Sequence, residues 1–280
     1  MQGTAISREE EREQIEIELL LEGIYRFYGY DFRNYATSSI RRRIWHRINA
    51  WGLSSVSALL EKVLHEPDKM SELMTSMSVS VTEMFRDPAL FARFRSDCIP
   101  ELRQLPFVRI WHAGCSTGEE VLSMAILLEE EGLLDKSRIY ATDMNEEALA
   151  QAKSGTVPLR RMREYTRNYL LSGGSEEFSE YYNVKNDHVE FHPRFLENVV
   201  YAQHNLATDQ SFNEFHVIFC RNVLIYFNKT LQDQVHELFY DSLALNGMLA
   251  LGNRESINFT VRADCYEALL PNEKLYRKVR

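Results

Sequence analysis

The feature that most constrains the fold is an alternation of strand-like and helix-like segments that begins after Pro106. A strand-like run at Phe107–Trp111 is followed by a helical pattern at Glu119–Glu131, and a second run at Arg138–Thr142 is followed by another at Asn145–Lys153. Strands separated by helices pair in parallel, because each crossover returns the chain to the same end of the sheet. The sequence therefore predicts a doubly wound α/β domain. Its later segments are the strands Val217–Cys220 and Met248–Leu251 and the helix Lys229–Leu243.

A different pattern between Tyr181 and Asn205 predicts a small insert in this domain. Short runs alternate there with turns that contain Asn, Asp and Pro, which is typical of antiparallel strands. We expect two or three strands within about residues 178–204, at Tyr181–Val184, His188–Phe191 and Val199–Ala202.

The start of the chain contains helical patterns only. We expect a small all-α domain with a linker at residues 1–85, followed by the α/β domain at residues 86–280. Ser7 and Glu10 form a capping-box pattern at the start of the first helix. Apolar stripes predict three more helices, at Thr37–Trp51, Ser55–Leu64 and Asp68–Met77.

Composition narrows the class of protein. The net charge is −9, from 32 basic and 41 acidic residues, so we do not expect nucleic acid as a partner. The four cysteines are far apart, and His188 and His192 lie four apart in a strand-like segment, so we expect neither disulfides nor a metal site. The acidic start and the lack of an uncharged run of roughly 18 residues predict a cytoplasmic protein with no direct membrane insertion.

An arginine-rich stretch contrasts with the overall negative charge. Five arginines and no acidic residue lie between Arg33 and Leu60. Ile40, Ile44 and Ile48 predict the buried stripe of a helix there, which leaves four arginines to project from the remaining surface: Arg41, Arg42, Arg43 and Arg47. Such a cluster is either a solvated helix face or a docking surface for an anionic partner, and both interpretations stay open.

The strongest local pattern is the loop Trp111–Glu120, between the first parallel strand and its helix. Ligands of α/β sheets bind at the carboxyl ends of strands, where glycines such as Gly114 let the backbone approach the ligand. Asp143 ends the next strand about 25 residues after Gly118, where an acidic residue accepts ribose hydroxyls in nucleoside-binding folds. For the two glycines alone, a plain tight turn is the alternative.

Two glutamates in this loop distinguish between classes of nucleotide. Glu119 and Glu120 begin the helix and would repel a pyrophosphate, and the loop is not Gly-x-Gly-x-x-Gly, so NAD is disfavoured. A nucleoside without phosphates is favoured. S-adenosylmethionine is such a ligand, and its cationic sulfonium and ammonium groups suit Glu119 or Glu120.

Five blocks, in order along residues 24–280, resemble the chemotaxis receptor methyltransferase (CheR) family. They are Val81–Pro88, the Trp111–Glu120 loop, Ala141–Asp143, Asn205–Leu206 and Ile218–Phe227. The resemblance implies a Rossmann-like S-adenosylmethionine-dependent methyltransferase domain preceded by an all-α domain. It also implies a protein-glutamate O-methyltransferase that acts on the cytoplasmic helices of chemoreceptors and contacts them through the helical domain and the β insert.

The same resemblance implies roles for single residues. Arg86 and Tyr226 fall beside the transferring methyl group and are the candidate catalytic residues. The cofactor-binding candidates are Ser80, Thr82, Arg86, Gly114, Glu120, Asp143, Asn205, Leu206, Arg221 and Asn222. Ser80 stands where the family usually has Asn, which puts one cofactor contact in question. The departures at Met84, Val121 and His216 predict changes in packing or surface only.

The chemistry that the resemblance implies agrees with these candidate residues. A glutamate carboxylate has a pKa near 4.3 and is already an ionised nucleophile at neutral pH, so no strong general base is required. A rival interpretation is an adaptor that keeps the cofactor and has lost turnover, but the intact Arg86, Asp143 and Tyr226 argue against it. A nucleic-acid amino-methyltransferase is also disfavoured, because the chain lacks the Pro-Pro motif of such enzymes.

Overall fold

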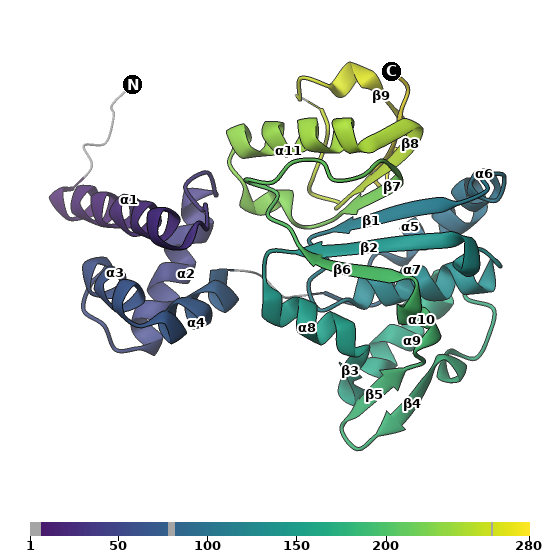
Figure 1. The fold of residues 1–280 in the computed structure, drawn as a ribbon, viewed down its shortest axis with the longest axis horizontal. Helices are drawn as coiled ribbons and strands as arrows, with labels where there is room; N and C mark the ends of the chain where they lie inside the picture. Colours follow the sequence, from purple (N-terminus) through teal and green to yellow (C-terminus); the bar gives the residue numbers. More distant parts are fainter. Residues whose placement is uncertain (1–6, 78–81, 259) are drawn as a thin grey trace. The chain divides into compact units, whose positions relative to one another are not determined.

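The computed structural model describes residues 7–77, 82–258 and 260–280. Its contacts divide the chain into two compact units (Figure 1). The smaller unit comprises Met1–Val79 and the short segment Tyr226–Gln232, and the larger comprises Ser80–Ile225 and Asp233–Arg280. Ser80, one of the cofactor-binding candidates, lies outside the described residues.

Helices make up the smaller unit. They are α1 (Arg8–Tyr28), α2 (Thr37–Ala50), α3 (Val56–His65) and α4 (Pro67–Met77). The capping box is confirmed, because the Ser7 hydroxyl accepts a hydrogen bond from the Glu10 amide and the Glu10 carboxylate accepts one from the Ser7 amide. Apolar side chains at helical spacing, such as Leu20 of α1 and Ile44 of α2, are buried and form the core of this unit.

Backbone hydrogen bonds fix the segment that returns to the smaller unit. The Ala36 amide donates to the Tyr226 carbonyl at 2.8 Å, and the Asn228 amide donates to the Asn34 carbonyl at 2.9 Å. Ala36 is also the N-cap residue of α2. Tyr226 is therefore held by the loop that leads directly into the arginine-rich helix.

A seven-stranded sheet forms the centre of the larger unit, with the strand order β6-β2-β1-β7-β8-β10-β9. The first five strands of this order are parallel, whereas β10 is antiparallel to β8 and β9 is antiparallel to β10. The bounds are β1 (Val108–Ala113), β2 (Ser137–Asp143), β6 (Val199–Gln203), β7 (Phe215–Cys220), β8 (Leu243–Leu251), β9 (Tyr266–Leu270) and β10 (Leu275–Lys278). The predicted parallel sheet is confirmed for five strands, and the antiparallel edge is an addition to it.

Helices α7 and α8 pack against β2, next to the centre of the sheet. The side chains between α7 and the strands are apolar and fully buried, among them Ile110, Met124 and Ile126. The helices of this unit are α5 (Pro88–Arg93), α6 (Ile99–Leu102), α7 (Glu119–Glu130), α8 (Glu146–Ser154), α9 (Met162–Leu171) and α10 (Arg194–Glu197). One more helix, α11 (Lys229–Ser242), begins in the segment assigned to the smaller unit.

The predicted insert is present, but one of its strands was assigned to the wrong sheet. A small antiparallel sheet has the order β3-β5-β4, formed by β3 (Thr156–Pro158), β4 (Tyr182–Lys185) and β5 (His188–Phe191). The run at Val199–Ala202 instead belongs to β6, which pairs in parallel with β2 (Figure 1). A half-exposed edge strand has the same alternating composition as a strand of a small insert, so the local pattern does not identify its partner.

The described ranges contain neither a candidate membrane span nor a candidate metal cluster. No helix there combines the length and the apolarity that a membrane crossing needs. Nor do three or more His, Cys, Asp or Glu side chains of those ranges gather closely enough to hold a metal ion.

Candidate functional site

The strand order of the main sheet reverses between β1 and β7, which is where ligands bind in open α/β sheets. The strands that surround this point each end in a predicted site residue. The loop Gly114–Gly118 follows β1, Asp143 is the last residue of β2, Asn205 follows β6, and Arg221 and Asn222 follow β7. Because these strands are parallel, residues from four separate blocks of the sequence are brought to one edge of the sheet.

The loop after β1 needs its glycines for both conformation and space. Gly114 has φ +78° and Gly118 has φ +91°, in the left-handed region that side chains rarely adopt. A Cβ atom on Gly118 would lie 2.8 Å from the Cβ of Ala152, and one on Gly114 would lie 2.6 Å from Cγ2 of Val223. The loop therefore packs closely against Ala152 and Val223, and a residue larger than glycine would be strained at both positions.

Asp143 closes this loop and keeps part of its carboxylate available. Its Oδ2 accepts from the Ser116 amide and its Oδ1 from the Asn145 amide, both at 2.9 Å. A carboxylate has about four lone-pair positions, so each oxygen retains capacity for a ligand hydroxyl. Burial raises the pKa of Asp143 above its usual value, although both amide hydrogen bonds favour the ionised form.

A buried charge network joins the start of α7 to the end of β7. Arg221 Nη1 lies 2.7 Å from Glu120 Oε2, and His112 Nδ1 lies 3.1 Å from Glu120 Oε1. Arg221 also donates to the Arg86 carbonyl at 3.1 Å and pairs with the Asp87 carboxylate. Burial alone would raise the pKa of Glu120, but the charge of Arg221 and the contact with His112 outweigh it and lower the pKa to about 2.

This network gives Arg221 a structural role besides the cofactor contact that the sequence predicts. Only 2% of its side chain is exposed, and its two terminal nitrogens bond Glu120, Asp87 and the Arg86 carbonyl, whereas its Nε is buried without a hydrogen-bond partner among the described residues. We conclude that Arg221 holds Glu120 ionised and fixes the segment that carries Arg86. That segment is also tied to α7, because the Phe85 amide donates to the Ser123 hydroxyl at 2.8 Å.

Glu255 is a site residue that the sequence analysis missed. Its buried carboxylate accepts from the amides of Asn222 at 3.0 Å, Gly252 at 2.6 Å and Ile225 at 3.4 Å. Burial raises its pKa above the usual value. Glu255 thereby holds Asn222 in the left-handed conformation, with φ +62°, and shapes the loop after β7.

Other predicted residues differ in how many of their polar groups are already bonded. Asn222 has a buried side-chain oxygen with no hydrogen-bond partner among the described residues, so it is an acceptor available to a ligand. Asn205 accepts from the Ala207 amide at 3.0 Å, which turns the chain after β6 and leaves Leu206 half-buried. Thr82 is half-buried as well and begins the segment that leads to Arg86.

The departures from the family pattern concern packing, as expected. Met84 and Val121 are fully buried in the core of the larger unit. His216 lies on β7, where its Nδ1 accepts from the Arg109 amide at 2.9 Å. None of these three residues touches the network around Glu120 in the hydrogen bonds of the described chain.

The arginine cluster does not project as the sequence predicted. Arg43 is only 6% exposed, so its assignment to the surface is wrong. Arg41 is exposed but makes a two-pronged ion pair with Glu13, and Arg47 donates to the Glu72 carbonyl. The physical reason for the burial of Arg43 is tertiary: its guanidinium donates to the Met77 carbonyl and lies over the Tyr226 ring, and these two residues are distant in sequence.

Two stretches of the chain match described sequence families. Residues 15–78 match "CheR methyltransferase, all-alpha domain", and residues 80–268 match "CheR methyltransferase, SAM binding domain". The chain belongs to the CheR methyltransferase family.

Individual relatives agree with this membership. A Pseudomonas putida protein provisionally named methyltransferase Cher3 is 48% identical over 269 residues, which cover 96% of this chain and 98% of that protein. The chemotaxis protein methyltransferase of Salmonella typhimurium is 27% identical over 85% of this chain and 83% of its own length. The solved N-methyltransferase NodS from Bradyrhizobium japonicum, in complex with S-adenosyl-l-homocysteine, is 12% identical with a TM-score of 0.39, over 71% of this chain and 89% of that one. A score this low supports no functional conclusion.

The CheR family membership gives the cofactor as S-adenosylmethionine, and the site residues fit it. Gly114 and Gly118 give the loop after β1 a conformation that other residues rarely adopt, Asp143 has lone pairs for ribose hydroxyls, and ionised Glu120 complements a cation. The orphaned oxygen of Asn222 adds one further acceptor.

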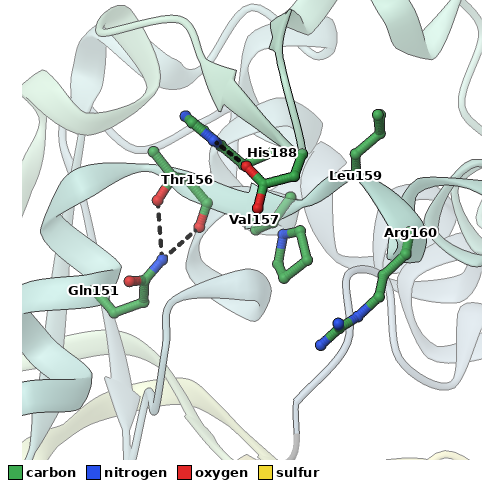
Figure 2. A pocket seen from close by; sticks show the side chains of 8 residues that line it. Gln151, Thr156, Val157, Leu159, Arg160 and His188 are labelled. Carbon is green, nitrogen blue, oxygen red and sulfur yellow. Dashed lines mark hydrogen bonds and ion pairs between the residues drawn. The ribbon is translucent and has the colours of Figure 1, made fainter.

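A pocket of about 610 Å³ lies elsewhere, beside the small sheet of this CheR protein. Figure 2 shows that Gln151 donates to Thr156 while Arg160 and His188 line other parts of the same hollow. None of the predicted cofactor residues lines it, so this pocket is separate from the cofactor site.

Proposed function

We propose that this protein transfers the methyl group of S-adenosylmethionine to glutamate side chains of chemoreceptor cytoplasmic helices, which yields glutamate methyl esters. The names of its relatives support a role in chemotaxis. The observation that carries the proposal is the hydrogen bond from Arg221 to the Arg86 carbonyl at 3.1 Å. Through it, the candidate anchor of a substrate carboxylate is tied to Glu120, the acid that faces the cofactor.

The reaction asks the protein for alignment more than for acid–base catalysis. S-adenosylmethionine supplies an electrophilic methyl group on a sulfonium. The glutamate carboxylate is ionised at neutral pH, so the residues must orient one of its oxygens and remove part of its water. Arg86 is proposed to hold a carboxylate through its forked donors, either that of the cofactor's methionine part or that of the substrate. Tyr226 is proposed to orient the substrate carboxylate by a hydrogen bond from its hydroxyl.

Three cofactor contacts are proposed from the hydrogen bonds and charges of the site. Asp143 accepts ribose hydroxyls, Glu120 balances the positive charge of the methionine part, and Asn222 accepts one further hydrogen bond. The other proposed contacts, which rest on the family resemblance, are Ser80, Thr82, Arg86, Gly114, Asn205, Leu206 and Arg221.

Receptor docking is proposed for the exposed face of α2. Arg42 is exposed and forms no ion pair within the described ranges, so its charge is available to an anionic receptor helix. Arg41 contributes less net charge because Glu13 neutralises it at 2.6 Å. The proposed partner is the cytoplasmic domain of a chemoreceptor, which agrees with the proposed cytoplasmic location of this protein.

A labelling experiment tests this function. The protein is incubated with S-adenosylmethionine labelled in its methyl group and with chemoreceptor cytoplasmic fragments from the same organism. Label that mild base releases supports glutamate esterification. Base-stable label contradicts it in favour of N-methylation, and no label despite intact S-adenosylhomocysteine binding identifies an adaptor that has lost turnover.

A further inference from the structure

The proposed docking role does not explain why the charged side chain of Arg43 is buried. Its side chain is 6% exposed and has no carboxylate partner within 4 Å among the described residues. One of its terminal nitrogens, Nη2, is buried without any hydrogen-bond partner there. Burying a guanidinium without a counter-charge is unfavourable, and an apolar residue would fill the same space at lower cost. A residue retained under these conditions is expected to serve a purpose other than packing.

The contacts that Arg43 does make lead to two segments. Its guanidinium carbon lies 4.6 Å from the centre of the Tyr226 ring, and Nη1 donates to the Met77 carbonyl at the end of α4. Tyr226 follows the site residue Asn222 by four positions in the chain, and Met77 precedes Thr82 by five. All three contacting residues belong to the smaller unit.

The Tyr226 ring has few other restraints in this unit. Its backbone is fixed by Ala36, and the following Phe227 packs edge-on against Tyr35 with ring centroids 4.9 Å apart. The Tyr226 side chain itself is half-exposed. Among the described residues, the cation–π contact with Arg43 therefore sets the direction of the ring, and with it the direction of the hydroxyl.

We propose that Arg43 is a positioning residue for Tyr226, which fixes the phenol so that its hydroxyl meets the substrate carboxylate in one orientation. This proposal rests on the methyl transfer and the role of Tyr226 proposed above. Since Arg43 follows the exposed Arg42 directly on α2, the same helix then docks the receptor with one arginine and orients the catalytic tyrosine with the next. Orientation of this kind affects turnover far more than substrate affinity.

Kinetics of three variants test the proposal. Arg43→Gln is expected to lower kcat about tenfold, with the KM for the receptor fragment and the S-adenosylhomocysteine affinity nearly unchanged. Arg43→Lys is expected to restore most of the rate, because an ammonium also binds an aromatic face. The matched control is Arg42→Gln, which is expected to raise KM at constant kcat. A rise in KM with unchanged kcat for Arg43→Gln would overturn the proposal and return Arg43 to docking.

A double-mutant cycle and a spectroscopic readout separate this proposal from a purely structural role. In the Tyr226→Phe background, Arg43→Gln is expected to cause no further loss of kcat, whereas an additive loss contradicts action through the phenol. In the full chain with 3-fluorotyrosine at position 226, Arg43→Gln is expected to shift the fluorine resonance and Arg42→Gln to leave it in place. If the fluorine resonance does not move in Arg43→Gln, the positioning contact is rejected, whether or not the wild type methylates a receptor. Failure of the proposed function is detected separately, by the methylation assay of the wild type.

Discussion

Arg221 Nη1 and Glu120 Oε2 lie 2.7 Å apart, in an ion pair that leaves 2% of the Arg221 side chain exposed. The pair joins the end of β7 to the start of α7 across the point where the strand order reverses. It therefore keeps Glu120 ionised and fixes the position of the Arg86 backbone.

The pH dependence of stability in Glu120→Gln tests how much this ion pair stabilises the fold. The pKa of Glu120 is lowered from 4.5 to about 2, so its interactions stabilise the fold above the unfolded-state pKa and are lost as pH falls toward the folded-state value. The free energy of unfolding in urea is expected to fall less steeply between pH 4.5 and pH 2 in Glu120→Gln than in the wild type. The exposed Glu267→Gln is the control, and equal slopes for Glu120→Gln and wild type would contradict the assignment.

Asp143→Asn is expected to weaken binding of S-adenosylhomocysteine by about 1.5–3 kcal/mol, because charge-assisted hydrogen bonds to the ribose are lost. Asn keeps the size of the side chain and one acceptor, but its NH₂ group would face one of the two backbone amides that Asp143 binds, so the free energy of unfolding is measured beside the affinity. Calorimetry measures the affinity. An unchanged dissociation constant would remove Asp143 from the cofactor site.

Arg86→Ala is expected to abolish most methyl transfer, by roughly 100-fold or more, while the melting temperature stays near that of the wild type. The reason is that Arg221 bonds the backbone carbonyl of residue 86, which the substitution leaves in place. Melting curves and initial rates on receptor fragments check both parts. Ordinary kinetics in this variant would show that the assignment of Arg86 is wrong.

Glu255→Gln is expected to lower the free energy of unfolding by about 1–3 kcal/mol, because an amide NH₂ would face backbone N–H donors that the carboxylate now satisfies. The loop of Asn222 should loosen with it, so cofactor affinity is expected to fall as well. Urea denaturation and calorimetry measure the two effects. If both quantities match the wild type, Glu255 does not organise this loop.

Arg42→Glu is expected to slow methylation of receptor fragments at low salt without a change in cofactor affinity, because its exposed charge attracts an anionic helix. Added salt should slow the wild type toward the variant, since exposed charges are screened beyond about 8–10 Å at physiological ionic strength. The measurement is the methylation rate of the wild type and of Arg42→Glu at several salt concentrations. Equal rates at low salt would identify Arg42 as part of a merely solvated face.

The parts of the site that were predictable from sequence are those encoded locally. The Gly114–Gly118 loop and Asp143 each follow a recognisable strand, and parallel strands bring their carboxyl ends together. Glu255 was missed because it lies 33 residues from its partner Asn222, and a buried carboxylate that binds backbone amides has no local signature. Its role becomes visible only once the strands β7 and β8 pair.

The errors in the prediction have the same origin. Val199–Gln203 has the composition of an edge strand, and its partner is chosen by tertiary pairing with β2. Arg43 lies three residues after Ile40, so a stripe counted only at every fourth residue does not show that it is buried. The burial of Arg43 depends on Met77 and Tyr226, which are distant in sequence.

Glutamate as the methyl acceptor is best tested by mapping the modified residue. Chemoreceptor fragments are treated with the protein and S-adenosylmethionine, digested and analysed by mass spectrometry before and after mild base. We expect a methyl group on a glutamate side chain that base removes, and no modification of a fragment in which that glutamate is replaced by alanine. A base-stable methyl group on lysine, arginine or a chain terminus would show that the acceptor is not glutamate.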